Sequence, residues 1–408
     1  MKLLKASWLI CIDENSTIIK DGAILFDEKI KDFGTIDSLK EKYKNLEIED
    51  LGENSVLMPG LINSHIHLEF SSNSTTLSYG NFMSWLNSVI ANRETLIEKS
   101  NTKLIDKKLD EMLKGGTTTI GAISSYGFEI EACKKTPINT VLFCEVIGSR
   151  ADMVDTLFTD FKARLQNVKK YASKSFIPAI AIHSPYSVHP FLVRETLNIA
   201  KEENLSVSAH FLESIEEFDW LHKDEGSFLD FFKNFLGQEK SVTKPMEFLQ
   251  QFKGIKNLSF THCVEASDND LNKIKELEAI INHCPTSNRV LNNKRLEIEK
   301  LNSMDYSIGT DGLSSNNSLQ MFDELRNALM IHTNLNINEL SFDLLKAATI
   351  NGAKALGLNK GRIKKDYDAD IIVCKLPDEV KDEKELCTQV ILHTKDVSKV
   401  YINGEQHA

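Results

Sequence analysis

At both ends of the chain, short apolar stretches alternate with polar residues and turn formers, which is the pattern of half-buried β-strands. Neither end has enough strands to bury a sheet face alone, so we expect the two ends to pair into one small β-sandwich. The expected strands are residues 4–12, 16–19, 22–26, 29–33, 367–374, 390–393 and 397–404.

Between the ends, amphipathic helical patterns alternate with β-branched apolar runs. Residues 102–114 form such a helix, which Gly115 and Gly116 end, and residues 117–122 form the strand that follows. The alternation predicts a (β/α)8 TIM barrel, whose active site lies at the C-terminal ends of the strands. Further strands are expected at 176–182, 205–211, 258–263, 279–284 and 306–310. We expect the barrel to span residues 58–358 and the composite β-sandwich to comprise residues 1–57 and 359–408.

The length, composition and charge of the chain exclude some classes of function. A chain of 408 residues, 41% of them hydrophobic, can form a barrel of about 250 residues plus a smaller domain. The net charge of −11 argues against a nucleic-acid partner. Seven cysteines without a Cys-x-x-Cys predict reduced thiols. With no secretory pattern and no apolar stretch that could span a bilayer, we expect a cytoplasmic protein without a membrane partner.

The sequence His65-Ile66-His67 follows a long apolar run and offers the first candidate chemistry. Residues i and i+2 of a strand lie on one face, so both imidazoles can reach one metal ion. A His-x-His pair alone is weak evidence, because two polar residues at a strand end need no ligand.

Residues 59–67, which read Pro-Gly-Leu-Ile-Asn-Ser-His-Ile-His, resemble the signature of the amidohydrolase superfamily. Later segments resemble barrel strands 5, 6 and 8 of its deaminase branch, and other segments match the same branch. The strand matches are residues 205–213, 259–263 and 308–312, and the others are 181–188, 283–288, 311–326 and 347–357. The resemblance therefore covers nearly the whole chain.

The resemblance implies one divalent metal ion. Its ligands would be His65, His67, His210 and Asp311. Zinc suits this set, and iron or manganese fits the same ligands. A binuclear site would need a bridging residue, for which Glu145 is the nearest candidate.

The resemblance also implies catalytic roles. Metal-bound hydroxide attacks purine C6, and Glu213, three residues after His210, protonates the adjacent ring nitrogen. His262 orients the attacking water, and Asp311 accepts its proton. Without the resemblance, Glu213 would be interpreted as a solvated carboxylate at the start of a helix. His262 would be interpreted as a core histidine.

Residues 67–71, His-Leu-Glu-Phe-Ser, most resemble the 6-aminodeoxyfutalosine deaminases of menaquinone biosynthesis. Such a substrate is an adenine nucleoside whose arm ends in a carboxylate, which a guanidinium group suits. The candidates for this contact are Arg150 and Arg289. His183 is expected to contact the sugar or the arm, and Trp85 to form a pocket wall.

Other functions are compatible with some of the same residues. The branch includes deaminases of S-adenosylhomocysteine, methylthioadenosine and adenosine, and hydrolases of cyclic amides or chlorinated rings. A non-enzymatic scaffold would be expected to have lost ligands, and the zinc-deaminase architecture with Pro-Cys-x-x-Cys is excluded because the motif is absent. We expect a homodimer, the commonest symmetric assembly.

Overall fold

The computed structural model describes residues 1–72, 75–301 and 303–408. Eight parallel strands form the central sheet, and each hydrogen-bonds to the next in chain order. They are β8 (Leu61–Ile66), β9 (Thr117–Ser124), β10 (Asn139–Val146), β11 (Phe176–Ile182), β12 (Val207–Phe211), β13 (Leu258–His262), β14 (Ile280–His283) and β15 (Tyr306–Ile308). This arrangement confirms the predicted barrel.

The first and last strands meet to close the ring. The Ser64 hydroxyl donates to the Ile308 carbonyl at 2.9 Å, and the Asp311 backbone N–H donates to the His65 carbonyl at 3.0 Å. Gly309 permits this approach, because a Cβ atom there would lie 2.8 Å from the Cβ of His65. Closure therefore brings the two ends of the barrel sequence together beside His65.

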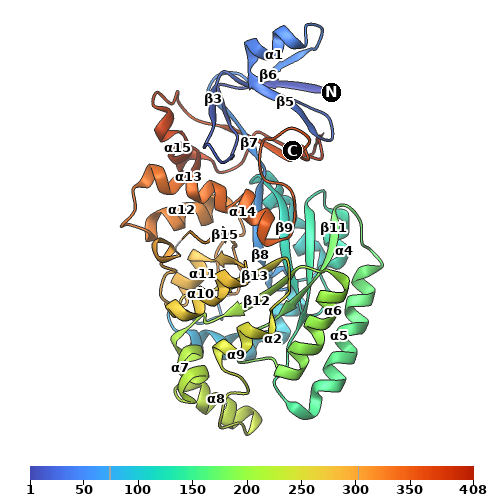
Figure 1. The fold of residues 1–408 in the computed structure, drawn as a ribbon, viewed down its shortest axis with the longest axis vertical. Coiled ribbons are helices and arrows are strands. Elements are labelled where there is room, and N and C mark those ends of the chain that lie inside the picture. Colours follow the sequence, from blue (N-terminus) through green and yellow to red (C-terminus); the bar gives the residue numbers. More distant parts are fainter. Residues whose placement is uncertain (73–74, 302) are drawn as a thin grey trace.

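Helices cover the outside of the barrel (Figure 1). They are α3 (Thr102–Lys114), α4 (Ile130–Lys135), α5 (Val154–Lys169), α6 (Pro190–Glu203), α9 (Pro245–Gln251), α10 (Asp268–Glu276), α11 (Pro285–Val290), α12 (Met321–Ile331), α13 (Ile337–Ala347) and α14 (Ile350–Ala355). Three more lie at the end away from the chain termini: α2 (Phe82–Lys99), α7 (Ile215–Lys223) and α8 (Ser227–Leu236). This is the end toward which the strands run, so these helices surround the expected site.

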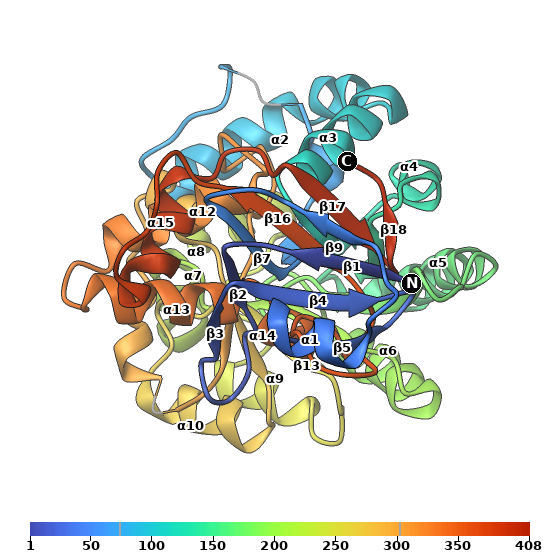
Figure 2. The ribbon, with the colours of Figure 1, turned by 90° about the horizontal axis from the view of Figure 1, so that it is seen from above.

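The two chain ends lie together above the barrel (Figures 1 and 2). One sheet has the order β18 (Glu405–Gln406), β17 (Lys399–Ile402), β16 (Ile371–Lys375), β7 (Ser55–Pro59), β2 (Trp8–Ile10), β3 (Ile18–Lys20). The other has the order β5 (Ile30–Thr35), β4 (Gly22–Phe26), β1 (Lys2–Lys5), β6 (Ile48–Asp50), and α1 (Ile36–Lys42) follows β5. The antiparallel pairing of β7 with β16 joins the ends in one sheet, as predicted, whereas the domain limits 1–57, 58–358 and 359–408 remain predictions.

The prediction of a strand at residues 390–393 is wrong, because these residues belong to helix α15 (Leu386–His393). A short apolar run fits a buried helix as well as a strand. Tertiary contacts decide here: α15 packs against α12 and α13, and the Arg326 guanidinium donates to the carbonyls of Ile391 and Thr394 at the helix end.

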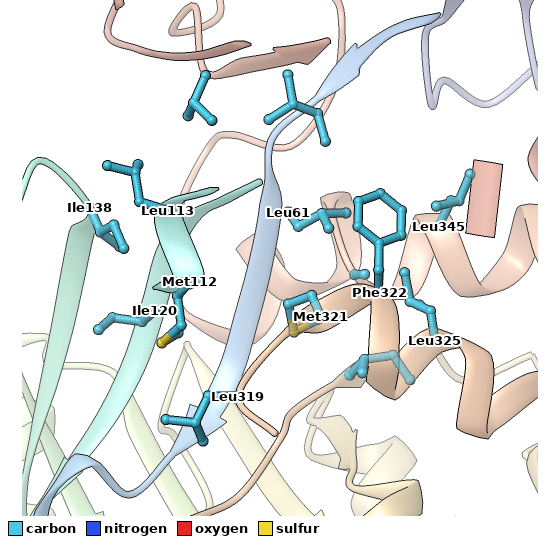
Figure 3. Close-up of a cluster of buried hydrophobic side chains, with 14 of the residues drawn as sticks. Leu61, Met112, Leu113, Ile120, Ile138, Leu319, Met321, Phe322, Leu325 and Leu345 are labelled. Atoms are coloured by element: carbon cyan, nitrogen blue, oxygen red, sulfur yellow. The ribbon is translucent and has the colours of Figure 1, made fainter. Parts of the chain in front are cut away.

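A large apolar cluster fixes the barrel against its outer helices and the terminal sheet (Figure 3). Leu61 of β8 and Ile120 of β9 contribute to it, with Met112 of α3 and Phe322 of α12, and all four side chains are buried. Burial of each such side chain contributes about 1.5–3 kcal/mol. The strand that carries His65 is thus packed on both flanks.

The predictions about the cysteines and about membrane-spanning segments can be compared with the structure. Each of the seven cysteines is buried and free, as expected of reduced thiols. Within the described ranges, no helix has both the length and the apolar character needed to cross a membrane.

Candidate active site

A cavity of about 580 Å³ opens at the C-terminal ends of the barrel strands. Five of the predicted metal-binding or catalytic residues line it directly, and His65 lies buried behind its floor. The five are His67, His210, Glu213, His262 and Asp311. The barrel therefore collects side chains that are far apart in the sequence.

Three imidazoles converge at the floor. The Nε2 atom of His67 lies 3.2 Å from that of His65 and 3.4 Å from that of His210. In two of the three rings the other nitrogen faces an oxygen atom: Nδ1 of His210 donates to the His183 carbonyl at 2.7 Å, and Nδ1 of His65 lies 3.3 Å from the Thr261 hydroxyl. With Nδ1 carrying the proton, the Nε2 lone pairs face one another, an arrangement that a shared cation stabilises.

Burial keeps His65 and His210 neutral, as metal ligands must be. Desolvation lowers the pKa of His65 well below its ordinary value, and it lowers the pKa of His210 to about 3. Three converging imidazoles and a nearby carboxylate form a donor set that suits one divalent transition-metal ion.

Asp311 faces this group from the loop that follows β15. Its Oδ1 atom lies 3.6 Å from Nε2 of His67 and 3.9 Å from Nε2 of His65. Its Oδ2 atom accepts hydrogen bonds from Ser287 and Ser315 at 2.8 and 2.9 Å. Burial alone would raise the pKa of Asp311, but the neighbouring imidazoles outweigh it and hold that pKa below its ordinary value. The carboxylate is therefore ionised and fixed in orientation.

Glu213 and His262 form the other side of the floor. Oε1 of Glu213 lies 3.6 Å from Nε2 of His262, and Nδ1 of His262 donates to the Asn288 side-chain oxygen at 2.9 Å. That leaves the buried Nε2 of His262 without a hydrogen-bond partner. Burial raises the pKa of Glu213 well above its ordinary value, and the charges of Asp311 and Glu217 raise it further. A protonated carboxyl group thus lies beside a neutral imidazole.

The backbone is strained at two of these positions. His262 and Asp311 have φ values of 72° and 60°, in the left-handed region that residues other than glycine rarely adopt. Such a conformation costs roughly 1–3 kcal/mol and persists only where the surroundings enforce it. Here it turns both side chains onto the floor, His262 at the last residue of β13 and Asp311 in the loop that follows β15.

Glu217 of α7 fixes the backbone that carries Glu213. Its carboxylate accepts hydrogen bonds from the backbone N–H groups of Leu212 and Glu213 at 3.1 and 2.9 Å. Glu217 is fully buried, and Ser214 caps the first turn of its helix. Glu217 therefore positions Glu213 through the main chain.

Glu217→Ala is expected to lower the free energy of unfolding by about 2–4 kcal/mol, because each unsatisfied buried N–H costs about 1–3 kcal/mol. The midpoint of thermal unfolding measures this loss. Glu216→Ala on the same helix is the control and should change the midpoint little. An equal shift in both variants would contradict the role of Glu217.

Three of the four residues predicted to contact the substrate line the cavity, and the fourth does not. Trp85 and His183 both line the cavity, and Trp85 Nε1 donates to the Ser314 carbonyl at 2.8 Å, which ties α2 to the loop after β15. Arg150 also lines the cavity, but its guanidinium is paired with the Asp152 carboxylate at 3.0 and 2.5 Å. Arg289 lies outside the cavity lining.

Glu145, the candidate for a bridging ligand, lies next to His183 and His210, and one ligand atom from each lies within 4.8 Å of the others. Oε2 of Glu145 accepts a hydrogen bond from the Ser125 hydroxyl, and its buried Oε1 has no partner.

Several supporting residues had no role in the sequence analysis. Thr261, Ser287 and Asn288 position His65, Asp311 and His262, respectively. Ser287 and Asn288 belong to the segment 283–288 that resembles the deaminase branch, so the resemblance carried a signal for them. Thr261 and Ser315 also lie in matched segments, 259–263 and 311–326, whereas Glu217 lies outside all of them.

Comparisons with known proteins identify the family. The model of the amidohydrolase family matches residues 56–406. An aminodeoxyfutalosine deaminase from Nitratiruptor sp. is 44% identical over 391 residues, 96% of each chain, and an adenosine deaminase from Helicobacter pylori is 35% identical over 99% of each chain. The crystal structure of Helicobacter pylori aminofutalosine deaminase in complex with methylthio-coformycin has a TM-score of 0.95 and 34% identity, and each chain is covered completely. The chain belongs to the amidohydrolase family.

Proposed function

We propose that this protein is a metal-dependent hydrolytic deaminase of an adenine nucleoside. One observation carries the proposal: a carboxylate, an imidazole and a second carboxyl group, from Asp311, His262 and Glu213, lie within 4.8 Å of one another beside the three converging imidazoles. This set offers a proton donor and a proton acceptor at one reacting centre. The deaminase names of the similar proteins support the same reaction.

His65, His67, His210 and Asp311 would hold the metal ion, which we propose to be zinc. When bound, such an ion supplies Lewis acidity, which lowers the pKa of a water ligand from about 15.7 to roughly 7. The converging Nε2 atoms and the ionised carboxylate fit one divalent ion.

The chain's own residues would move the protons. The raised pKa of Glu213 keeps its carboxyl group protonated, so it can donate to the ring nitrogen next to purine C6. His262 is neutral, and its unpartnered Nε2 can accept a hydrogen bond from the attacking water. Asp311 is ionised, so it can accept the proton of that water and pass it to the departing ammonia.

We further propose that the substrate is 6-aminodeoxyfutalosine, converted to futalosine and ammonia in menaquinone biosynthesis. The 44% identity to an aminodeoxyfutalosine deaminase and the fold shared with an aminofutalosine deaminase support this choice. The cavity of about 580 Å³ also leaves room beyond an adenine ring on the floor for a substituent on the ribose.

A substrate panel tests the function. We expect ammonia release and loss of adenine absorbance with 6-aminodeoxyfutalosine, and a kcat/KM at least tenfold lower with adenosine, methylthioadenosine and S-adenosylhomocysteine. Equal efficiency on all four would indicate a broad adenosine-type deaminase. Ammonia from none of them would refute the deaminase and direct the search to chlorinated-ring and cyclic-amide substrates.

A further inference from the structure

The outer part of the active-site cavity is apolar. Helix α2 contributes Leu86, Val89 and Ile90, and helix α8 contributes Phe231, Phe235 and Leu236. The side chains of Ile90 and Phe235 remain exposed, although both are large and apolar. An exposed apolar wall that continues into a catalytic cavity is typical of a binding surface. With adenine on the floor, this wall would meet a substituent at the 5′ position of the ribose.

Two arginines, Arg93 and Arg150, line this cavity, and they differ in whether a carboxylate neutralises their charge. The guanidinium of Arg150 is neutralised by two hydrogen bonds to Asp152. Arg93 of α2 has no carboxylate partner among the residues that the structure describes. Arg93 therefore presents an uncompensated positive charge at an apolar wall, where it can pair with an anionic ligand group.

An aromatic ring holds Arg93 in place. Its guanidinium carbon lies 5.0 Å from the centroid of the Tyr126 ring, in a cation–π contact. The loop that carries Tyr126 is fixed in turn by Glu69, whose buried carboxylate accepts hydrogen bonds from the backbone N–H groups of Ser125, Tyr126 and Gly127. Glu69 follows His67 by two residues, so the metal-binding segment and the support of Arg93 are connected.

We propose that Arg93 is a specificity-determining residue that binds an anionic group at the end of an apolar or aromatic 5′ substituent of the substrate. The inference rests on the proposed function, since it places the nucleoside by its adenine on the floor. Tyr126 acts as a positioning residue, because it reaches the substrate only through Arg93.

A matched pair of adenine nucleosides tests this inference. The 5′-(4-carboxyphenylthio) and 5′-(4-carbamoylphenylthio) derivatives of 5′-deoxyadenosine have nearly the same size and differ in charge. The parent protein is expected to prefer the acid, and Arg93→Gln to lower this preference in kcat/KM about tenfold, through KM and with kcat retained. Arg93→Lys and Tyr126→Phe should retain most of the preference, and Tyr126→Leu should reduce it about two- to threefold.

Arg194 offers a matched control, because its guanidinium carbon also lies 5.0 Å from an aromatic centroid, that of Phe191, away from the cavity. Arg194→Gln should leave the preference unchanged. An unchanged preference in Arg93→Gln, an equal loss on both nucleosides, or a loss in Arg150→Gln alone would overturn the proposal.

Failure of the proposed function would look different: the parent would release no ammonia from either nucleoside. Calorimetric binding of the acid and the amide to the parent and to Arg93→Gln then tests Arg93 without turnover. Tighter binding of the acid that Arg93→Gln abolishes would support the inference, and equal dissociation constants in the parent would overturn it.

Discussion

Glu213→Gln is expected to lower kcat on an adenine nucleoside by about 10³-fold or more, because an amide cannot donate the proton that the raised pKa of Glu213 keeps on its carboxyl group. Glutamine keeps nearly the same shape and leaves the backbone N–H of residue 213 free to donate to Glu217. Steady-state ammonia release measures the loss, and metal content and thermal midpoint should stay near the parent values.

Glu216→Gln is the matched control three residues along the chain, since Glu216 does not line the cavity. Its kcat should remain within about twofold of the parent. A Glu213→Gln rate within a few-fold of the parent would contradict the role of Glu213 as proton donor, whatever the metal content.

Removal of the metal ion should abolish turnover. Protein treated with a chelator is expected to retain less than about 1% of its activity and to recover on addition of one equivalent of zinc, because the bound ion would supply the Lewis acidity that lowers the pKa of a water ligand. Elemental analysis of untreated protein should give close to one divalent ion per chain. Two equivalents would contradict a mononuclear site and direct attention to Glu145.

His210→Ala complements the chelation experiment. It removes one converging Nε2 donor and should lower the bound metal well below one equivalent, together with activity. His222→Ala is the control, because His222 lies on the exposed side of α7. Full metal occupancy in His210→Ala would show that the ion lies elsewhere.

Most of the barrel could be predicted because apolar residues recur at different spacings in its strands and in its helices. Helix 102–114 and strand 176–182 have the predicted limits. Strand β10 was not among the expected strands, although its eight residues are all buried: a continuously buried strand has no alternation of apolar and polar positions. Helix α15 was mistaken for a strand for the related reason that a short apolar run has no distinct period.

The candidate metal ligands could be selected from the sequence because each lies at or shortly after the C-terminal end of a barrel strand within a recognisable motif, and their role as ligands stays a prediction. The residues that orient them depend on contacts between separate elements, such as Thr261 of β13 with His65 of β8 and Asn288 of α11 with His262 of β13. Local sequence does not encode such contacts. Arg93 was missed for a similar reason. Arg93 stands out because, among the described residues, it has no carboxylate partner, whereas Arg150 in the same cavity is paired with Asp152. Only the assembled cavity shows this difference.

The closure of the barrel between β8 and β15 also has a consequence for folding. His65 and Asp311 become neighbours only when the eighth strand docks against the first, and contacts so distant in sequence form late and slowly. A chain still emerging from the ribosome therefore presents the His-x-His pair long before its carboxylate partner exists. Tight capture of the ion should coincide with the final docking event, so that metal uptake during refolding reports completion of the ring.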